Sequence, residues 1–139
     1  MGFRVIIVED DFNARRNWEI VCKNLEVESF APECKSASEF YKAVEEILNK
    51  IQTCDVFVLD LNLDGESGEG GGKGLWEQFN EEGMIFGCEL LVSSQRVIGK
   101  ELDEFLTKWK AHYCSSIDQH RKQEKLKDVL EQIKKKRNS

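Results

Sequence analysis

Long apolar runs are missing from this sequence of 139 residues. No run approaches the roughly 20 residues that a membrane-spanning helix needs, so we expect neither a membrane segment nor a membrane partner. The first apolar run, Val5–Val8, stops at the acidic residues Glu9–Asp11, which is too early and too acidic for a signal peptide. These absences favour a cytoplasmic location.

Closely spaced cysteine pairs and histidine clusters are also missing. The cysteines are Cys22, Cys34, Cys54, Cys88 and Cys114. No two of them lie within four residues, which excludes a CxxC zinc or redox pair and favours reduced thiols. The only histidines, His112 and His120, have no metal-ligand partner at helical spacing, and two isolated histidines argue against a phosphohistidine donor.

The net charge of −6 hides an uneven distribution. Residues 121–139 hold eight basic and three acidic side chains, whereas residues 1–120 hold 12 basic and 23 acidic ones, a balance of −11. An acidic body argues against nucleic acid as a partner, because phosphate binding needs a basic face. The length fits a single domain over residues 1–139, and we expect no output domain.

Strand-like and helix-like apolar patterns alternate along the chain. Val5–Val8 and Val56–Leu59 are continuous apolar runs, typical of strands buried on both faces of a parallel sheet. Helical stripes follow the strands, and one begins at a capping box formed by Ser36 and Glu39. The expected strands are residues 5–8, 27–31, 56–59, 90–92 and 113–114. This order predicts an α/β fold, a doubly wound five-stranded parallel sheet with helices on both faces.

Three of the expected strands end in acidic or hydroxyl residues, namely Glu9, Asp10 and Asp11, then Asp60 with Asn62, then Ser93 and Ser94. The carboxyl ends of parallel strands share one edge of the sheet, where ligands bind. Crowded carboxylates repel each other unless a cation neutralises them, and such oxygen ligands select Mg²⁺ or Mn²⁺. Asp60 is placed to act as a nucleophile, and Ser93 to hydrogen-bond a phosphoryl oxygen.

Each of these residues also has an ordinary structural interpretation. Acids after strands often cap the next helix, so Glu9–Asp11 taken alone are equally well explained as caps. Asp60 alone fits a cap or turn, and Ser93 alone fits a plain polar residue. The combination favours a functional site, because acid pair, single aspartate and hydroxyl stand at three strand ends in that order.

These motifs resemble the receiver domain of two-component response regulators, the CheY-like family. Val5–Asp11 resembles the first strand and acid pair of the family, Val56–Gly65 resembles its phosphoacceptor strand and turn, and Leu91–Ser94 resembles its fourth strand. The resemblance implies strand order 2-1-3-4-5. It also implies site roles for Glu9 and Asp10 (metal), Asp60 (phosphoacceptor and metal), Asn62 (metal, through its backbone carbonyl), Ser93 and Ser94 (phosphate and switch), and Tyr113 (aromatic switch).

The function implied by this resemblance is phosphoryl acceptance. A histidine kinase or phosphotransfer protein would supply the phosphoryl group to Asp60 in the presence of Mg²⁺ or Mn²⁺. The modified domain would then signal through a downstream protein partner. Any catalysis of its own would be limited to self-phosphorylation and self-dephosphorylation.

The sequence departs from the family near the fifth strand. Receivers carry a lysine there, usually followed by proline, and the aligned positions hold Ser116 and Ile117. Asp64 also stands where receivers often have proline, and the chain has only one proline, Pro32. Serine cannot supply the charge of an ammonium, so another cation would have to replace it. The nearby candidates are Lys110, Arg121 and Lys122.

A glycine-rich insertion is the second departure. Residues 64–74 contain six glycines in eleven positions, which predicts a loop. Ser67 and Gly74 stand where a P-loop requires glycine and a hydroxyl residue, so this is not a nucleotide-binding motif. A spacer is the simpler interpretation. A sharper one is that Lys73 supplies the missing cation.

Two alternatives remain open. The first is a degenerate receiver, a protein-interaction module that acts without phosphorylation, and Ser116 with Ile117 supports it. The second is a Mg²⁺-dependent phosphatase with Asp60 as nucleophile. The haloacid dehalogenase pattern needs Asp-x-Asp, and Asn62 stands in place of its second acid.

Overall fold

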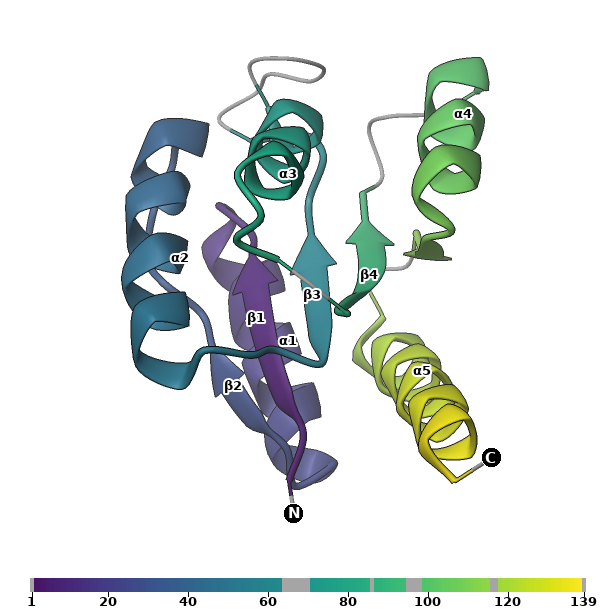
Figure 1. The fold of residues 1–139 in the computed structure, drawn as a ribbon. Helices are drawn as coiled ribbons and strands as arrows, with labels where there is room; N and C mark the ends of the chain where they lie inside the picture. Colours follow the sequence, from purple (N-terminus) through teal and green to yellow (C-terminus); the bar gives the residue numbers. More distant parts are fainter. Residues whose placement is uncertain (1, 64–70, 86, 95–98, 116–117, 139) are drawn as a thin grey trace.

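The fold is a parallel sheet between two layers of helices (Figure 1). The computed structural model describes residues 2–63, 71–85, 87–94, 99–115 and 118–138. The strands are β1 (Arg4–Val8), β2 (Glu28–Phe30), β3 (Val56–Leu59), β4 (Glu89–Ser93) and β5 (His112–Cys114). The helices are α1 (Phe12–Asn24), α2 (Ala37–Ile51), α3 (Gly72–Glu81), α4 (Lys100–Trp109) and α5 (Gln119–Arg137). The strand order is β2-β1-β3-β4-β5, so the predicted fold class and order are confirmed.

Alternation along the strands divides the core between the two faces of the sheet. Val5 and Ile7 of β1 pack with buried side chains of α1 and α5 on one face. Ile6 and Val8 pack with those of α2, α3 and α4 on the other. Because both faces are covered, Val5–Val8 of β1 and all four residues of β3 are apolar, as the sequence predicted.

The strand register brings the ends of the strands to a common edge. Val8 of β1 lies beside Leu59 of β3, and Leu59 lies beside Val92 of β4. The residues that follow these three positions therefore emerge together. We call this side of the sheet the carboxyl edge, and the opposite side, where Arg4, Asp55 and Glu89 begin or precede strands, the amino edge.

Local signals explain most of the helix boundaries. The predicted Ser36 cap is present, because its hydroxyl accepts a hydrogen bond from the Glu39 backbone N–H at 3.3 Å. Gly83 follows the end of α3 with a left-handed φ of 66°, a conformation that favours glycine. In the expected loop 64–74, however, α3 already begins at Gly72, so the last three residues are helical. Residues 64–70, with Ser116 and Ile117, lie outside the described residues.

All five cysteines have free thiols in the structure. Tertiary structure nevertheless brings two of them together near the amino edge, where the sulfur atoms of Cys54 and Cys88 lie 2.8 Å apart. Their separation by 34 residues hid this contact from an argument based on spacing. Among the described residues, no helix is long and apolar enough to span a membrane.

Candidate functional site

Three acidic side chains from two strand ends meet at the carboxyl edge. Carboxylate oxygens of Glu9, Asp10 and Asp60 all lie within 4.8 Å of one another. Glu9 is 6 % exposed and Asp60 is 9 % exposed, so two of the three are buried, and Asp10 is half-buried. The convergence predicted for these residues is therefore present in the structure.

Backbone groups hold the two buried carboxylates in place. The N–H of Asp11 donates to Oε1 of Glu9 at 3.1 Å, and the N–H of Asn62 donates to Oδ1 of Asp60 at 3.0 Å. The third residue of the acidic run has a different role, because Oδ2 of Asp11 accepts from the Ala14 N–H at 2.9 Å and caps α1. The capping interpretation is thus correct for Asp11, while Glu9 and Asp10 join the cluster. The metal role predicted for the Asn62 carbonyl stays a prediction.

Crowding and burial make this cluster unfavourable when all its members are charged. Burial, followed by the charge of Asp60, raises the pKa of Glu9 to about 9. Burial also raises the pKa of Asp60 to about 6, against the opposing hydrogen bond from Asn62. A divalent cation reverses this situation, because it stabilises the ionised form of every ligand. The donor set consists of hard carboxylate oxygens and fits Mg²⁺ or Mn²⁺.

The two serines at the end of β4 are buried beside the acidic cluster. Oγ of Ser93 accepts a hydrogen bond from Nε1 of Trp18 at 3.3 Å. Oγ of Ser94 makes no hydrogen bond of good geometry among the described residues, but it lies close enough to Asp60 for a weak hydrogen bond that helps to lower the pKa of that carboxyl. A buried hydroxyl held this loosely suits a site that receives a polar ligand.

Tyr113 on β5 is tied to the same segment. Its hydroxyl donates to the backbone carbonyl of Ser94 at 2.8 Å. The predicted switch residue therefore contacts the loop after β4 rather than the acidic cluster itself. Its change of rotamer on activation stays a prediction.

Two further residues shape the site and were not predicted from the sequence to do so. Trp18 fitted a core position of α1, and it is fully buried, but its indole also donates to Ser93. Gly72 packs so closely that a Cβ added there would lie 2.2 Å from the backbone oxygen of Asp60. Its N–H also donates to the Leu61 carbonyl at 3.0 Å, so α3 begins directly against the turn that carries Asp60. The unusual run of glycines was the only sequence signal for this contact.

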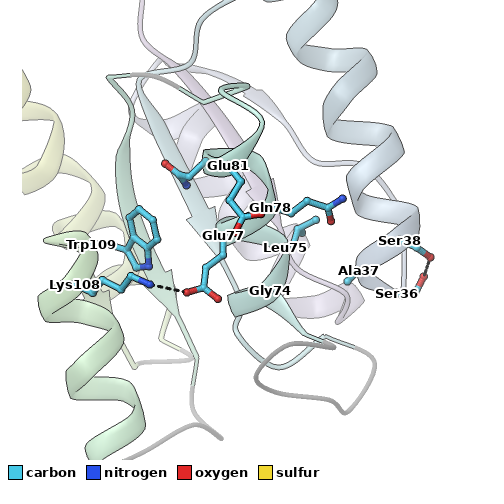
Figure 2. Close-up of a pocket in the computed structure, with 11 residues that line it drawn as sticks. Ser36, Ala37, Ser38, Gly74, Leu75, Glu77, Gln78, Glu81, Lys108 and Trp109 are labelled. Carbon is cyan, nitrogen blue, oxygen red and sulfur yellow. Dashed lines mark hydrogen bonds and ion pairs between the residues drawn. The ribbon is translucent and has the colours of Figure 1, made fainter.

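A separate hollow lies away from the acidic cluster, between α2, α3 and the end of α4 (Figure 2). Its volume is about 1040 Å³. Leu75 and Gln78 of α3 line it, as does Trp109 at the end of α4, where Nζ of Lys108 lies 3.1 Å from a carboxylate oxygen of Glu77. None of the clustered acids lines this hollow, so the carboxyl edge is a small polar site of its own.

Comparison with known proteins identifies the fold and nothing narrower. No family model matches the chain. No curated protein matches it either. Solved structures do match. A CheY-like response regulator receiver domain from Methylobacillus flagellatus is 20% identical, with a TM-score of 0.68 over 96% of this chain and 99% of that one.

Two further structures give the same result. The chemotaxis protein CheY4 from Vibrio cholerae is 12% identical, with a TM-score of 0.71 over 93% of this chain and 99% of that one. The receiver domain of the histidine kinase CKI1 from Arabidopsis thaliana, complexed with Mg²⁺ and BeF3⁻, is 15% identical. Its TM-score is 0.64 over 93% of this chain and 90% of that one. The chain thus has the fold of response regulator receiver domains.

Proposed function

We propose that this protein is a receiver that accepts a phosphoryl group on Asp60 in a Mg²⁺-dependent reaction. The observation that carries the proposal is the meeting of Glu9, Asp10 and Asp60 within 4.8 Å at the carboxyl edge of a receiver fold. The donor is a histidine kinase or a phosphotransfer protein, and the output is binding to a downstream protein. Among the structural relatives, the plant receiver is described as a complex with Mg²⁺ and BeF3⁻, which supports the choice of ligands.

The chain itself supplies the nucleophile and most of the donors. The Asn62 N–H holds Oδ1 of Asp60, which leaves Oδ2 to attack the phosphorus of a phosphohistidine. The new P–O bond forms as the P–N bond breaks, and the histidine leaves with a proton as neutral imidazole. Glu9, Asp10 and Asp60 would hold a Mg²⁺ ion, and that ion would supply positive charge to the phosphoryl oxygens.

The two serines have hydrogens to offer a phosphoryl group. Oγ of Ser93 accepts from Trp18, so its own O–H can still donate. Ser94 has a buried hydroxyl with no hydrogen bond of good geometry among the described residues. A phosphoryl group on Asp60 brings anionic oxygens to this region and gives both hydroxyls acceptors.

Labelling with acetyl phosphate and binding of beryllofluoride, each with Mg²⁺, test the proposal. We expect an acid-stable, base-labile acyl phosphate that maps to Asp60, and a change in tryptophan fluorescence. Asp60→Asn abolishes both signals, whereas Asp55→Asn, at the amino edge, keeps them. Labelling that persists in Asp60→Asn contradicts the proposal. A folded wild-type protein that gives no adduct favours an interaction module that acts without phosphorylation.

A further inference from the structure

One lysine of α5 is buried between the helices on one face of the sheet. Lys122 is 2 % exposed and lies in the first turns of α5, on the side that packs against α1. The other nearby cations have different surroundings, because Lys110 ends α4 and is exposed, and Arg121 is also exposed. A lysine is almost never fully buried unless its charge has a partner.

Among the described residues, Lys122 contacts an aromatic ring. Its Nζ lies 5.3 Å from the ring centre of Trp18. Within the described part of the chain, no carboxylate lies within ion-pair distance of that ammonium. A cation–π contact recovers only part of the hydration that a buried ammonium loses.

Acids of the site act on this ammonium from beyond ion-pair distance. Burial lowers the pKa of Lys122, and the negative charges of Glu9 and Asp11 oppose this shift. Both acids follow β1 at the carboxyl edge, so the lysine and the acidic cluster occupy the same electrostatic neighbourhood. Mutual attraction without direct contact leaves the ammonium available to another anion.

Trp18 connects the lysine to the phosphate-binding side of the site. The face of its indole lies under Lys122, while its Nε1 donates to Oγ of Ser93 at 3.3 Å. One fully buried ring thus fixes the position of a cation and of a hydroxyl that borders the acidic cluster. An ammonium on a flexible four-carbon stem can move from the ring to a nearby oxygen without any movement of the backbone.

We propose that Lys122 is the protein cation that binds the phosphoryl oxygens on Asp60, reaching the site from α5 past the ring of Trp18. This inference rests on the proposed function, because it concerns the group that Asp60 accepts. A dianionic phosphoryl group is the kind of ligand that binds well to an ammonium with no carboxylate partner among the described residues. Formation of this ion pair removes the cation from the Trp18 ring and so links the modification to the α1–α5 contact.

Substitution of Lys122 by methionine, Lys122→Met, tests the proposal in the full-length protein. The probes are Mg²⁺ alone and then beryllofluoride in saturating Mg²⁺, both followed by tryptophan fluorescence and calorimetry. Lys127→Met is the matched control, because Lys127 is an exposed lysine of the same helix. We expect Lys122→Met to weaken beryllofluoride binding by about 10-fold or more, as removal of a charge-assisted hydrogen bond does.

Magnesium binding separates this role from a merely structural one. Loss of a positive charge near the acids leaves Mg²⁺ affinity unchanged or raises it in Lys122→Met, whereas damage to the site weakens both ligands. Lys122→Gln, which is polar and neutral, gives the same pattern if the methionine variant folds poorly. Beryllofluoride affinity within about twofold of wild type in a folded variant overturns the role of Lys122. Failure of the wild type to bind beryllofluoride instead overturns the proposed function.

Discussion

The two edges of the sheet treat their acidic residues in opposite ways. At the amino edge, the Asp55 carboxylate accepts hydrogen bonds from the Arg4 backbone N–H at 2.8 Å and from the Arg137 side chain. Oε1 of Glu89 lies 3.2 Å from Nε2 of His112 and 3.5 Å from Nζ of Lys136. These carboxylates join strands β1, β3, β4 and β5 to the end of α5, so their charge serves the fold.

At the carboxyl edge, acids face one another instead. Glu9, Asp10 and Asp60 cluster within 4.8 Å, and within the described ranges no cation forms an ion pair with Glu9 or Asp60. Lys122, a buried cation that the charge of Glu9 attracts, lies over the ring of Trp18. The fold satisfies its acids at one edge and crowds them at the other, at a cost in stability, and such crowding is typical of sites that bind a ligand.

The dependence of stability on pH is the largest effect we expect from this difference. In the metal-free protein the pKa of Glu9 is raised from 4.5 to about 9 and that of Asp60 from 3.8 to about 6. Between the ordinary pKa and the raised pKa of each group, the folded state binds more protons than the unfolded state. The free energy of unfolding therefore falls as pH rises from about 4 to about 9. Thermal unfolding in EDTA at pH 5 to 9 measures the fall.

Addition of Mg²⁺ is the control for this profile. Bound metal keeps the carboxylates ionised in the folded state and stabilises that state by mass action. The difference in melting temperature with and without Mg²⁺ therefore grows as pH rises. An equal difference at all pH values contradicts the picture of crowded, metal-seeking carboxylates.

A methyl group at Gly72 tests the close packing of the carboxyl edge. Gly72→Ala places a Cβ at 2.2 Å from the Asp60 carbonyl oxygen, so α3 or the Asp60 turn has to shift. We expect a loss of about 2 kcal/mol in unfolding free energy and weaker Mg²⁺ binding. Gly2→Ala, just before β1, is the control, because a Cβ there meets nothing within 4 Å. If denaturant titrations give the two variants the same free energy of unfolding, Gly72 does not pack closely against the Asp60 carbonyl.

Neutralisation of one aspartate at each edge gives the smallest expected change, with opposite signs. Without metal, Asp60→Asn relieves repulsion from Asp10, and also from Glu9 at pH values above about 9 where Glu9 is ionised, and raises stability by about 1 kcal/mol. Asp55→Asn weakens bonds to Arg4 and Arg137 and lowers stability by about 1 kcal/mol. Urea unfolding in EDTA measures both. If the free energy of unfolding changes in the same direction in both variants, the proposed difference between the two edges is contradicted.

The pattern of the strands explains why much of the fold was predictable. Val56–Leu59 is apolar on both faces, and the structure places β3 at the same four residues. The Ser36 cap and the glycine at position 83 are local signals that act within one turn of helix. The start of α3 was not predictable in this way, because Gly72 owes its position to a contact with the distant Asp60 turn.

The candidate site likewise has residues that were predictable from local sequence and residues that were not. Acids directly after strands fixed the convergence of Glu9, Asp10 and Asp60, since a parallel sheet leaves no other place for them. Trp18 looked like an ordinary residue of an amphipathic helix, and Lys122 was only one of three candidate cations, with Lys110 and Arg121. The roles of Trp18 and Lys122 depend on how α1 and α5 pack, and a periodic pattern describes each helix separately.

The sequence by itself determined that the chain forms a parallel α/β sheet and that acidic residues gather at one edge. Both properties depend on neighbours in the chain: apolar runs, caps and the residue that follows each strand. Only the tertiary structure decided that Asp11 caps a helix while Glu9 and Asp10 join Asp60, that Cys54 meets Cys88, and that a buried lysine lies on Trp18. Contacts between distant segments set these outcomes, because burial and charge depend on which elements pack together.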